Sequence, residues 1–242
     1  MVDLSTIQKN IDDIQKNIDA AAARAGRNAS DIRLMAVTKT KPAEVVAMLQ
    51  QAGIRLYGEN YPEEVPDKIN EFRAEECTLA MIGHLQSRKA KLVADLFDEY
   101  HSLDRLDIAE KMESLLAERN KVMPVFIECN VGGEESKSGW TFGSDTLTDE
   151  FLKDFETVAA MPHLRVRGLM TLPPLVEDAE VNRKYFIRMR KIAEYLNTNM
   201  NARITELSMG TSADYSIAVE EGATMVRIGT ALVGPRDYKN RA

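Results

Sequence analysis

Residues 34–42 read LMAVTKTKP, an apolar run that ends on a lysine and is followed by a proline. Side chains of a strand alternate between its two faces, so Met35, Val37 and Lys39 share one face. The proline fits the first turn of a helix, which places Lys41 outside any pocket at the strand end. A lysine at the carboxyl end of a buried parallel strand lies where α/β proteins bind ligands. Lys39 is therefore a candidate for Schiff-base formation, and the alternative is a lysine that only caps the strand in solvent.

The length and composition are those of a globular protein with a sizeable core. The chain has 242 residues, of which 44% are hydrophobic and 29% are charged. An α/β barrel typically needs about 250 residues, so one domain accounts for the whole length. Cys77 and Cys129 are far apart and outside any CxxC spacing, which predicts neither a disulfide framework nor a metal site.

The charge and the N-terminus narrow the classes of partner. A net charge of −7 argues against a general nucleic-acid binder, because such proteins rely on a basic surface. The first residues lack the pattern of a secretory signal, and no apolar run approaches the about 18 residues of a membrane span. We expect a soluble, cytoplasmic protein that binds neither nucleic acid nor membrane.

Helical and strand patterns alternate along the chain. Residues 4–26 have apolar side chains at steps of three or four, which predicts a helix packed on the body of the domain. A coiled-coil seam is the alternative, but the pattern covers only about two heptads. Short apolar runs predict strands near 32–39, 55–58, 79–83, 100–103, 125–130, 166–171, 205–208 and 225–229. Helices are expected near 42–52, from 62, and near 87–96, 105–119, 148–160, 178–199, 213–221 and 230–233, with Asp104 as the N-cap of the fourth.

Eight strands that alternate with helices predict a parallel sheet closed as a single (β/α)8 TIM barrel. A doubly wound open sheet is the alternative, but it would be unusually wide at eight strands. No GxGxxG sequence follows the first strand, which argues against a dinucleotide site. We expect one domain over residues 1–242, in which residues 1–28 form an additional N-terminal helix packed on the barrel.

Polar residues gather where the predicted strands end, which is the face where barrels form their sites. Two segments predict a phosphate-binding corner, Ser208–Ser212 and Gly229–Thr230, because they offer hydroxyls, glycines and the first N–H groups of a helix. A simple N-cap is the alternative for each segment. The residues at or just after strand ends are Lys39, Asn60, His84, Met170, Ser208 and Thr230.

Arg227 shares its strand face with Met225 and Gly229, so it is expected to point away from Val226 and Ile228. A buried arginine needs a partner. The structural alternative is a salt bridge with Glu128 or Glu206, and the functional one is a donor to a ring nitrogen.

Motifs along nearly the whole chain carry a family resemblance. In order, they are AVTKTKP, YGENY, IGHLQS, SKSG, RGLMT, SMGTSADY and MVRIGTALVGPRDY. With them, the chain resembles the pyridoxal phosphate homeostasis proteins, also called the YggS/PROSC family, whose fold resembles the barrel domain of alanine racemase. One departure from the family pattern lies at Thr211–Asp214, where a Met-Ser-x-Asp sequence is common, and it keeps a hydroxyl.

The resemblance implies a cofactor and a set of residues that bind it. It implies that Lys39 holds pyridoxal 5'-phosphate (PLP) covalently as an internal aldimine, and that Arg227 faces the pyridine nitrogen. Asn60 is then near the ring substituents, and His84 lines the mouth. The residues implied to surround the phosphate are Ser208, Gly210, Thr211, Ser212, Gly229 and Thr230.

An arginine at the ring nitrogen disfavours chemistry that relies on PLP as an electron sink. Racemisation needs two acid/base groups on opposite faces of the substrate. Racemases of the resembled fold take the second group, a tyrosine, from a further domain of a partner chain. We expect that domain to be missing here, because the chain stops at Ala242, and the nearest substitutes are Tyr61 and Tyr215.

We therefore expect a PLP-binding protein without catalytic residues that carries or buffers PLP. PLP-dependent apo-enzymes are the expected recipients, and no oligomer is required. The 132–146 loop, rich in Gly, Ser and charge, is expected to gate access or to contact PLP through Lys137. Two alternatives are a small amino-acid racemase that uses PLP and a cofactor-free Schiff-base aldolase.

Overall fold

The computed structural model describes residues 2–74, 76–142 and 147–235. Its parallel strands form one sheet in the order β4-β3-β2-β1-β9-β8-β7-β5-β6, and pairing of β4 with β5 closes the sheet into a barrel. The predicted (β/α)8 barrel is confirmed. The barrel strands are β1 Arg33–Val37, β2 Leu56–Glu59, β3 Thr78–Met81, β4 Glu99–Leu103, β5 Met123–Asn130, β7 Leu164–Met170, β8 Glu206–Ser208 and β9 Met225–Ile228.

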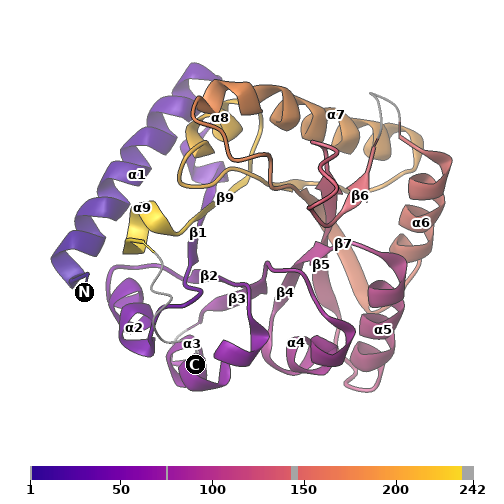
Figure 1. The fold of residues 1–242 in the computed structure, drawn as a ribbon, viewed down its shortest axis with the longest axis horizontal. Coiled ribbons are helices and arrows are strands. Elements are labelled where there is room, and N and C mark those ends of the chain that lie inside the picture. Colours follow the sequence, from indigo (N-terminus) through magenta and orange to yellow (C-terminus); the bar gives the residue numbers. More distant parts are fainter. Residues whose placement is uncertain (1, 75, 143–146, 236–242) are drawn as a thin grey trace.

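Helices surround the strands, as the ribbon in Figure 1 shows. The α-helices are α1 Leu4–Arg24, α2 Ala43–Gln51, α3 Ile69–Arg73, α4 Ala90–Leu96, α5 Leu106–Ala117, α6 Asp149–Ala159, α7 Arg183–Asn199, α8 Tyr215–Glu220 and α9 Thr230–Val233. Short 3-10 turns occupy Ala29–Asp31, Pro62–Glu64, Pro66–Lys68, Ser87–Lys89 and Ala179–Asn182. None of the helices in the described part of the chain is long and apolar enough to cross a membrane.

The additional N-terminal helix, α1, packs on the barrel as predicted. Asp3 is its N-cap and accepts a hydrogen bond from the Thr6 backbone N–H. The stripe that includes Ile7, Ile14 and Ile18 is buried, and α1 contacts α8 and α9. Helix α1 therefore covers the side of the barrel where the last two βα units close onto the first (Figure 1).

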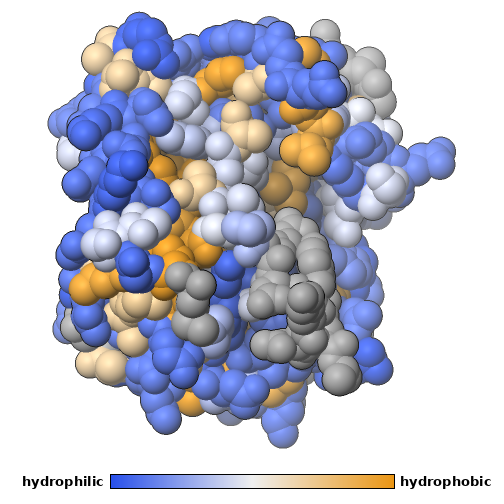
Figure 2. All heavy atoms as spheres, turned by 60° about the vertical axis from the view of Figure 1, so that its left-hand side comes forward, coloured by the Kyte–Doolittle hydropathy of each residue, from blue (hydrophilic) through white to orange (hydrophobic). Residues whose placement is uncertain are grey.

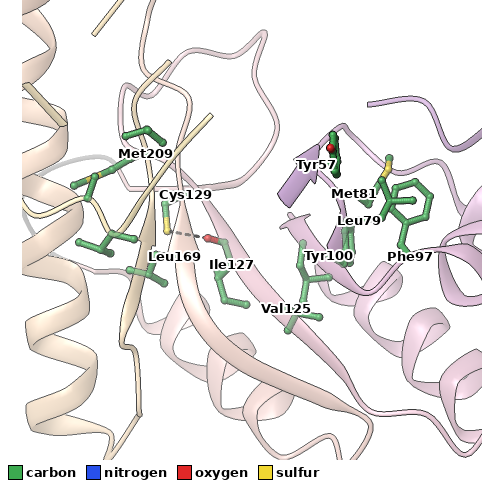
Figure 3. Close-up of a cluster of buried hydrophobic side chains, with 14 of the residues drawn as sticks. Tyr57, Leu79, Met81, Phe97, Tyr100, Val125, Ile127, Cys129, Leu169 and Met209 are labelled. Atoms are coloured by element: carbon green, nitrogen blue, oxygen red, sulfur yellow. Dashed lines mark hydrogen bonds between the residues drawn. The ribbon is translucent and has the colours of Figure 1, made fainter. Parts of the chain in front are cut away.

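The alternation of side chains along the strands produces two apolar layers. Inside the barrel, a small buried cluster contains Met35, Leu56, Ala80, Ile82, Phe126, Met170 and Met225. The residues between them face the helices, where the larger core lies. Figure 3 shows part of this outer core, with Val125, Ile127 and Cys129 spaced along β5 and Leu169 beside them on β7.

Charged side chains occupy the amino-terminal end of the barrel. Arg33 of β1 and Arg167 of β7 both contact Glu206 of β8, and their guanidinium groups lie 4.0 and 3.6 Å from Glu99 of β4. Glu99 also lies 2.8 Å from Nε2 of the buried His101, which stacks on Phe126. These ion pairs join strands at the end of the barrel opposite the strand ends where Lys39 lies.

Several local predictions are wrong in detail. Strand β1 ends at Val37, so Lys39 lies in the turn that follows it. The helix expected from residue 62 is split, because Pro62 and Pro66 each begin a short 3-10 turn before α3. Asp104 does not cap α5, whose N-cap is Arg105 without a side-chain hydrogen bond.

Candidate functional site

Lys39 lies at the carboxyl mouth of the barrel, in a turn closed by a hydrogen bond from the Lys41 N–H to the Thr38 carbonyl. Thr40, next in the turn, has a positive φ of 64°, a strained conformation for a β-branched residue. Its N–H donates to Glu64 Oε2 at 2.8 Å. Lys41 points elsewhere and donates to the Pro235 carbonyl, which agrees with the expectation that it lies outside the pocket.

A buried polar network holds this turn from behind. Thr38 Oγ1 donates to Glu59 Oε1, and Lys68 Nζ donates to the same oxygen, each at 2.8 Å. Lys68 also donates to the Thr38 carbonyl at 3.0 Å. All three residues are buried, and desolvation raises the pKa of Glu59. The position of the Lys39 backbone is therefore fixed by a charged pair that water does not reach.

Arg227 extends inside the barrel and connects the ends of two further strands. It pairs in register with Met35 of β1, and only 3% of it is exposed. Its Nη1 donates to Ser208 Oγ and its Nη2 to the Thr171 carbonyl, both at 2.8 Å. Neither Glu128 nor Glu206 forms an ion pair with it in the described structure, so the predicted structural alternative is not observed. Burial lowers the pKa of Arg227 to about 10, which leaves it cationic at neutral pH.

The two corners predicted to bind phosphate lie against each other. The Ala231 N–H, at the start of α9, donates to Ser212 Oγ at 3.2 Å. Gly210 has a φ of +93°, and a Cβ there would lie 2.6 Å from the Ala218 Cβ, so only glycine fits this tight turn. The backbone of Gly229 lies beside Val37, which brings the last corner next to the Lys39 turn.

Asp214 organises the first of these corners. Its Oδ1 accepts hydrogen bonds from Thr211 N and Oγ1, at 2.7 and 3.1 Å, and its Oδ2 accepts one from Asn182. Helix α8 starts at Tyr215, later than the predicted residue 213. The Thr211 amide is therefore engaged by Asp214 in this structure, and the hydroxyl of Ser208 by Arg227.

Asn60 and His84 lie after the second and third strands. The backbones of these two corners touch, because a Cβ on Gly83 would lie 2.4 Å from the Asn60 carbonyl oxygen. The buried Oδ1 of Asn60 has no hydrogen-bond partner among the described residues. His84 is half exposed, and its Nδ1 lies 2.6 Å from Asp104 Oδ2 and 3.0 Å from Ser138 Oγ.

The long segment after β5 lies at the same mouth. It contains the two-residue strand β6, Trp140–Thr141, which pairs with the end of β5 and which the sequence pattern does not predict. Lys137 Nζ donates to the Leu172 carbonyl at 3.0 Å and lies 2.5 Å from Glu134 Oε2. Residues 143–146 of the predicted 132–146 loop lie outside the described residues.

Two carboxylates at this mouth were not among the predicted site residues. Asp104 contacts both His84 and Arg105, and it is almost completely buried. Glu128 of β5 is 7% exposed, and its Oε2 has no hydrogen-bond partner among the described residues. The strand-face alternation that identified Arg227 also identifies Glu128, because both lie on inward faces of their strands.

The face of the molecule drawn in Figure 2 is largely hydrophilic, and apolar side chains gather on it in several patches. The fold brings together, at the carboxyl ends of the strands, polar groups that are far apart in the sequence. Lys39, Asn60, His84, Arg227 and the two corners all come from this one end of the barrel.

Comparisons with known proteins agree with this architecture. The family model described as alanine racemase, N-terminal domain, matches residues 9–237. A pyridoxal phosphate homeostasis protein of Pasteurella multocida is 39% identical over 236 residues, which cover 96% of this chain and 99% of that protein.

Two solved structures are informative at different levels. PipY of Synechococcus elongatus, solved with PLP bound, is 29% identical with a TM-score of 0.77, and the match covers 90% of this chain and all of PipY. An alanine racemase of Clostridium difficile is 13% identical with a TM-score of 0.71, covering 95% of this chain and 56% of the racemase, which shows a shared fold alone. By full-length similarity and by fold, the chain belongs to the family of pyridoxal phosphate homeostasis proteins, within the group defined by the N-terminal domain of alanine racemase.

Proposed function

We propose that this protein binds PLP at the carboxyl mouth of its barrel, bonds it covalently through Lys39, and holds it for exchange without substantial turnover. Two comparisons support PLP as the ligand. The curated relatives are named pyridoxal phosphate homeostasis proteins, and the PipY structure contains PLP. The assignment of individual residues of this chain to PLP is part of the proposal.

The observation that carries the proposal is the buried guanidinium of Arg227 below the Lys39 turn. Arg227 pairs with Met35 of β1, and the turn that carries Lys39 follows the end of this strand at Val37. Two of its five N–H groups are fixed by Ser208 and Thr171, and the other three have no hydrogen-bond acceptor within the described structure. A fixed cation inside an apolar barrel is suited to an acceptor atom of a planar ligand.

The polar atoms at the mouth fit a ligand with many hydrogen-bonding groups. Buried polar atoms in folded proteins are nearly always paired. Thr40 Oγ1, Asn60 Oδ1 and Glu128 Oε2 are buried without a partner among the described residues. The phosphate of PLP offers acceptor oxygens to the Thr40 hydroxyl, and its ring hydroxyl offers a donor to an oxygen of Asn60 or Glu128.

The roles we assign follow from these positions. Gly210, Thr211 and Ser212, together with Gly229 and Thr230, surround the phosphate, since the two corners are joined by the Ala231–Ser212 hydrogen bond. Ser208 orients Arg227 at the pyridine nitrogen. Asn60 lies near the ring substituents and His84 lines the mouth.

PLP supplies a reactive aldehyde. The amine nitrogen of Lys39 bonds to the aldehyde carbon, water leaves, and the resulting imine is reversed by water or by a competing amine. Reversible bonding of this kind keeps the free aldehyde scarce and leaves it transferable. PLP-dependent apo-enzymes of the cytoplasm are the recipients we propose, and this exchange requires no oligomer.

Two features of the chain disfavour catalytic turnover. A permanent cation at the ring nitrogen keeps that atom unprotonated and weakens the ring as an electron sink. A second acid/base group opposite Lys39 is needed for racemisation, and the hydroxyl of Tyr215 is engaged by Asn17 of α1 at 2.9 Å.

The test is the absorbance spectrum of the purified protein, before and after borohydride reduction, followed by peptide mapping. We expect a reduced PLP adduct on Lys39 in the parent protein, none in Lys39→Ala, and a normal one in the control Lys41→Ala. Equal occupancy and an equal spectrum in Lys39→Ala would overturn the proposal. Interconversion of alanine or serine enantiomers by the pure protein would favour a racemase instead.

A further inference from the structure

Glu128 is a buried carboxyl group inside the barrel, and the proposed function assigns no charge state and no role to it beyond its unpartnered oxygen. It lies on β5, two residues after Phe126, and pairs in register with Met170 of β7. Phe126 and Met170 both belong to the apolar cluster inside the barrel. By strand alternation, Glu128 faces this interior near the carboxyl mouth.

The surroundings of Glu128 do not favour an ionised carboxylate. Its Oε2 has no hydrogen-bond donor within the described structure. A second carboxylate, Asp104, approaches from the corner after β4, while Arg227 attracts Glu128 from β9 without forming an ion pair. Tyr100 of β4 and Cys129 of its own strand also interact electrostatically with Glu128.

These contacts place Glu128 between two charge states near neutral pH. Burial raises the pKa of Glu128 most, Asp104 raises it in the same direction and Arg227 lowers it, and together they bring the pKa from 4.5 to about 7. Tyr100 and Cys129 are neutral at this pH, because burial raises the pKa of each above its ordinary value.

Building on the function proposed above, we propose that Glu128 is protonated when PLP is bound, and that its Oε2–H then donates a hydrogen bond to the ligand. The argument is one of charge and of hydrogen bonding. PLP brings a phosphate with negative charge into a barrel mouth that already contains Asp104 and Glu128, so an ionised Glu128 would repel it. A neutral Glu128 removes that repulsion and gives the unpartnered Oε2 a proton to share.

Binding of PLP is then accompanied by a change in the protonation of Glu128. In the empty protein above neutral pH, Glu128 is a carboxylate, and binding takes one proton from solvent to form the carboxylic acid. Asp104 connects Glu128 electrostatically to His84, whose side chain is 51% exposed. Release of PLP returns the proton.

Glutamine is a neutral mimic of the protonated acid, so Glu128→Gln isolates this effect. The pH dependence of the Lys39 amine is common to both proteins and cancels in the ratio of their dissociation constants for PLP. Below about pH 6 the ratio of parent to variant is expected to be constant. Above about pH 8 it is expected to increase by nearly tenfold per pH unit, because the parent protein must first take up a proton.

The experiment measures PLP binding to both full-length proteins from about pH 6 to about pH 9, together with proton uptake on binding. The parent is expected to take up nearly one more proton per site than Glu128→Gln at about pH 8. A ratio that does not change with pH would overturn the proposal, and so would a ratio that falls as pH rises.

Infrared difference spectra of the parent protein keep the test independent of the variant. Bound minus free spectra at about pH 8.5 are expected to gain the C=O stretch of a protonated carboxyl group, and its absence would overturn the proposal. The test distinguishes failure of this proposal from failure of the proposed function. If only the protonation of Glu128 is wrong, the parent protein and Glu128→Gln both still form the borohydride-reducible adduct at Lys39. If the proposed function is wrong, neither protein forms it.

Discussion

The ammonium of Lys68 lies 2.8 Å from Oε1 of Glu59, directly behind the turn that carries Lys39. Both side chains are almost completely buried, at 6% and 0% exposure. Replacing both partners of a buried ion pair together changes the free energy of unfolding little. Removing one partner lowers it strongly, because the other charge is then buried without compensation. This pair therefore couples the stability of the fold to the position of the lysine.

We expect Lys68→Met to lower the free energy of unfolding by about 3–5 kcal/mol, because it leaves the buried Glu59 carboxylate without its cationic partner. Adding Glu59→Gln is expected to restore part of the loss. Urea unfolding measures both. The control is Lys89→Met, which breaks a surface pair with Glu63 and is expected to cost less than about 1 kcal/mol. Equal effects of Lys68→Met and Lys89→Met would contradict the interpretation.

Gly210→Ala is expected to destabilise the protein and to weaken PLP binding. An alanine there adopts a positive φ and places its Cβ 2.6 Å from the Ala218 Cβ and 2.9 Å from the Tyr215 Cα. Gly53→Ala is a matched control, since Gly53 has a φ of +92° and nothing within 4 Å of the added Cβ. Gly53→Ala is expected to lose only the conformational cost of about 1–2 kcal/mol in stability. Thermal unfolding compares the stability of the two variants, and PLP titration compares their affinity. If Gly210→Ala behaves like Gly53→Ala, the tight corner is not needed for phosphate binding.

Arg227→Lys keeps the charge but loses the planar fork that bonds Ser208 and Thr171 at once. We expect PLP to bind about tenfold or more weakly, equivalent to about 1.4 kcal/mol, with a shift of the bound cofactor's absorbance maximum. Arg190→Lys on the surface of α7 is the control. Unchanged affinity and absorbance in Arg227→Lys would show that the guanidinium does not face the ring.

Lys137→Ala removes the hydrogen bond that connects the segment after β5 to the Leu172 carbonyl after β7. If this contact restricts access to Lys39, the rate of PLP release is expected to increase about tenfold, since a hydrogen bond to a charged group contributes about 1.5 kcal/mol or more. Stopped-flow transfer of PLP to an acceptor amine measures the rate. The same rates in the variant and the parent protein would exclude a gating role.

The empty protein is expected to lose stability as pH rises from about 4.5 to about 7 because of Glu128. Its pKa is raised in the folded state, so in this range the folded protein retains a proton that the unfolded chain has lost. The full shift corresponds to about 3 kcal/mol. Unfolding of the parent protein and Glu128→Gln across this range gives the difference, which is expected to be constant above about pH 8. A difference that does not depend on pH contradicts the assignment.

The barrel was predictable because its signals repeat. Most strands coincide with an apolar run and most helices have an apolar stripe, so errors at the boundaries left the order of elements unchanged. The inward direction of Arg227 followed from strand alternation alone. The structure places Lys39 just beyond β1, yet at the predicted mouth.

The contacts between segments that are distant in the sequence could not be predicted from it. Asp104 is at a position typical of an N-cap, and only the approach of the β3 corner makes it a partner of His84. Lys68 resembles a surface lysine in the sequence, but the two proline-initiated turns bring it behind Thr38. The sequence predicts Ser208 as a phosphate ligand, but in the structure its hydroxyl oxygen accepts a hydrogen bond from Arg227 of the neighbouring strand.

Pairing between β1 and β9 joins the first strand of the barrel to the last. Lys39 precedes Arg227 by 188 residues in the sequence, so the ribosome makes the lysine long before it makes Arg227 and the Gly229 corner. A growing polypeptide that lacks β9 has the reactive amine but not its surroundings. Under the proposed function, capture of PLP at Lys39 must therefore wait until β9 has been synthesised and paired with β1.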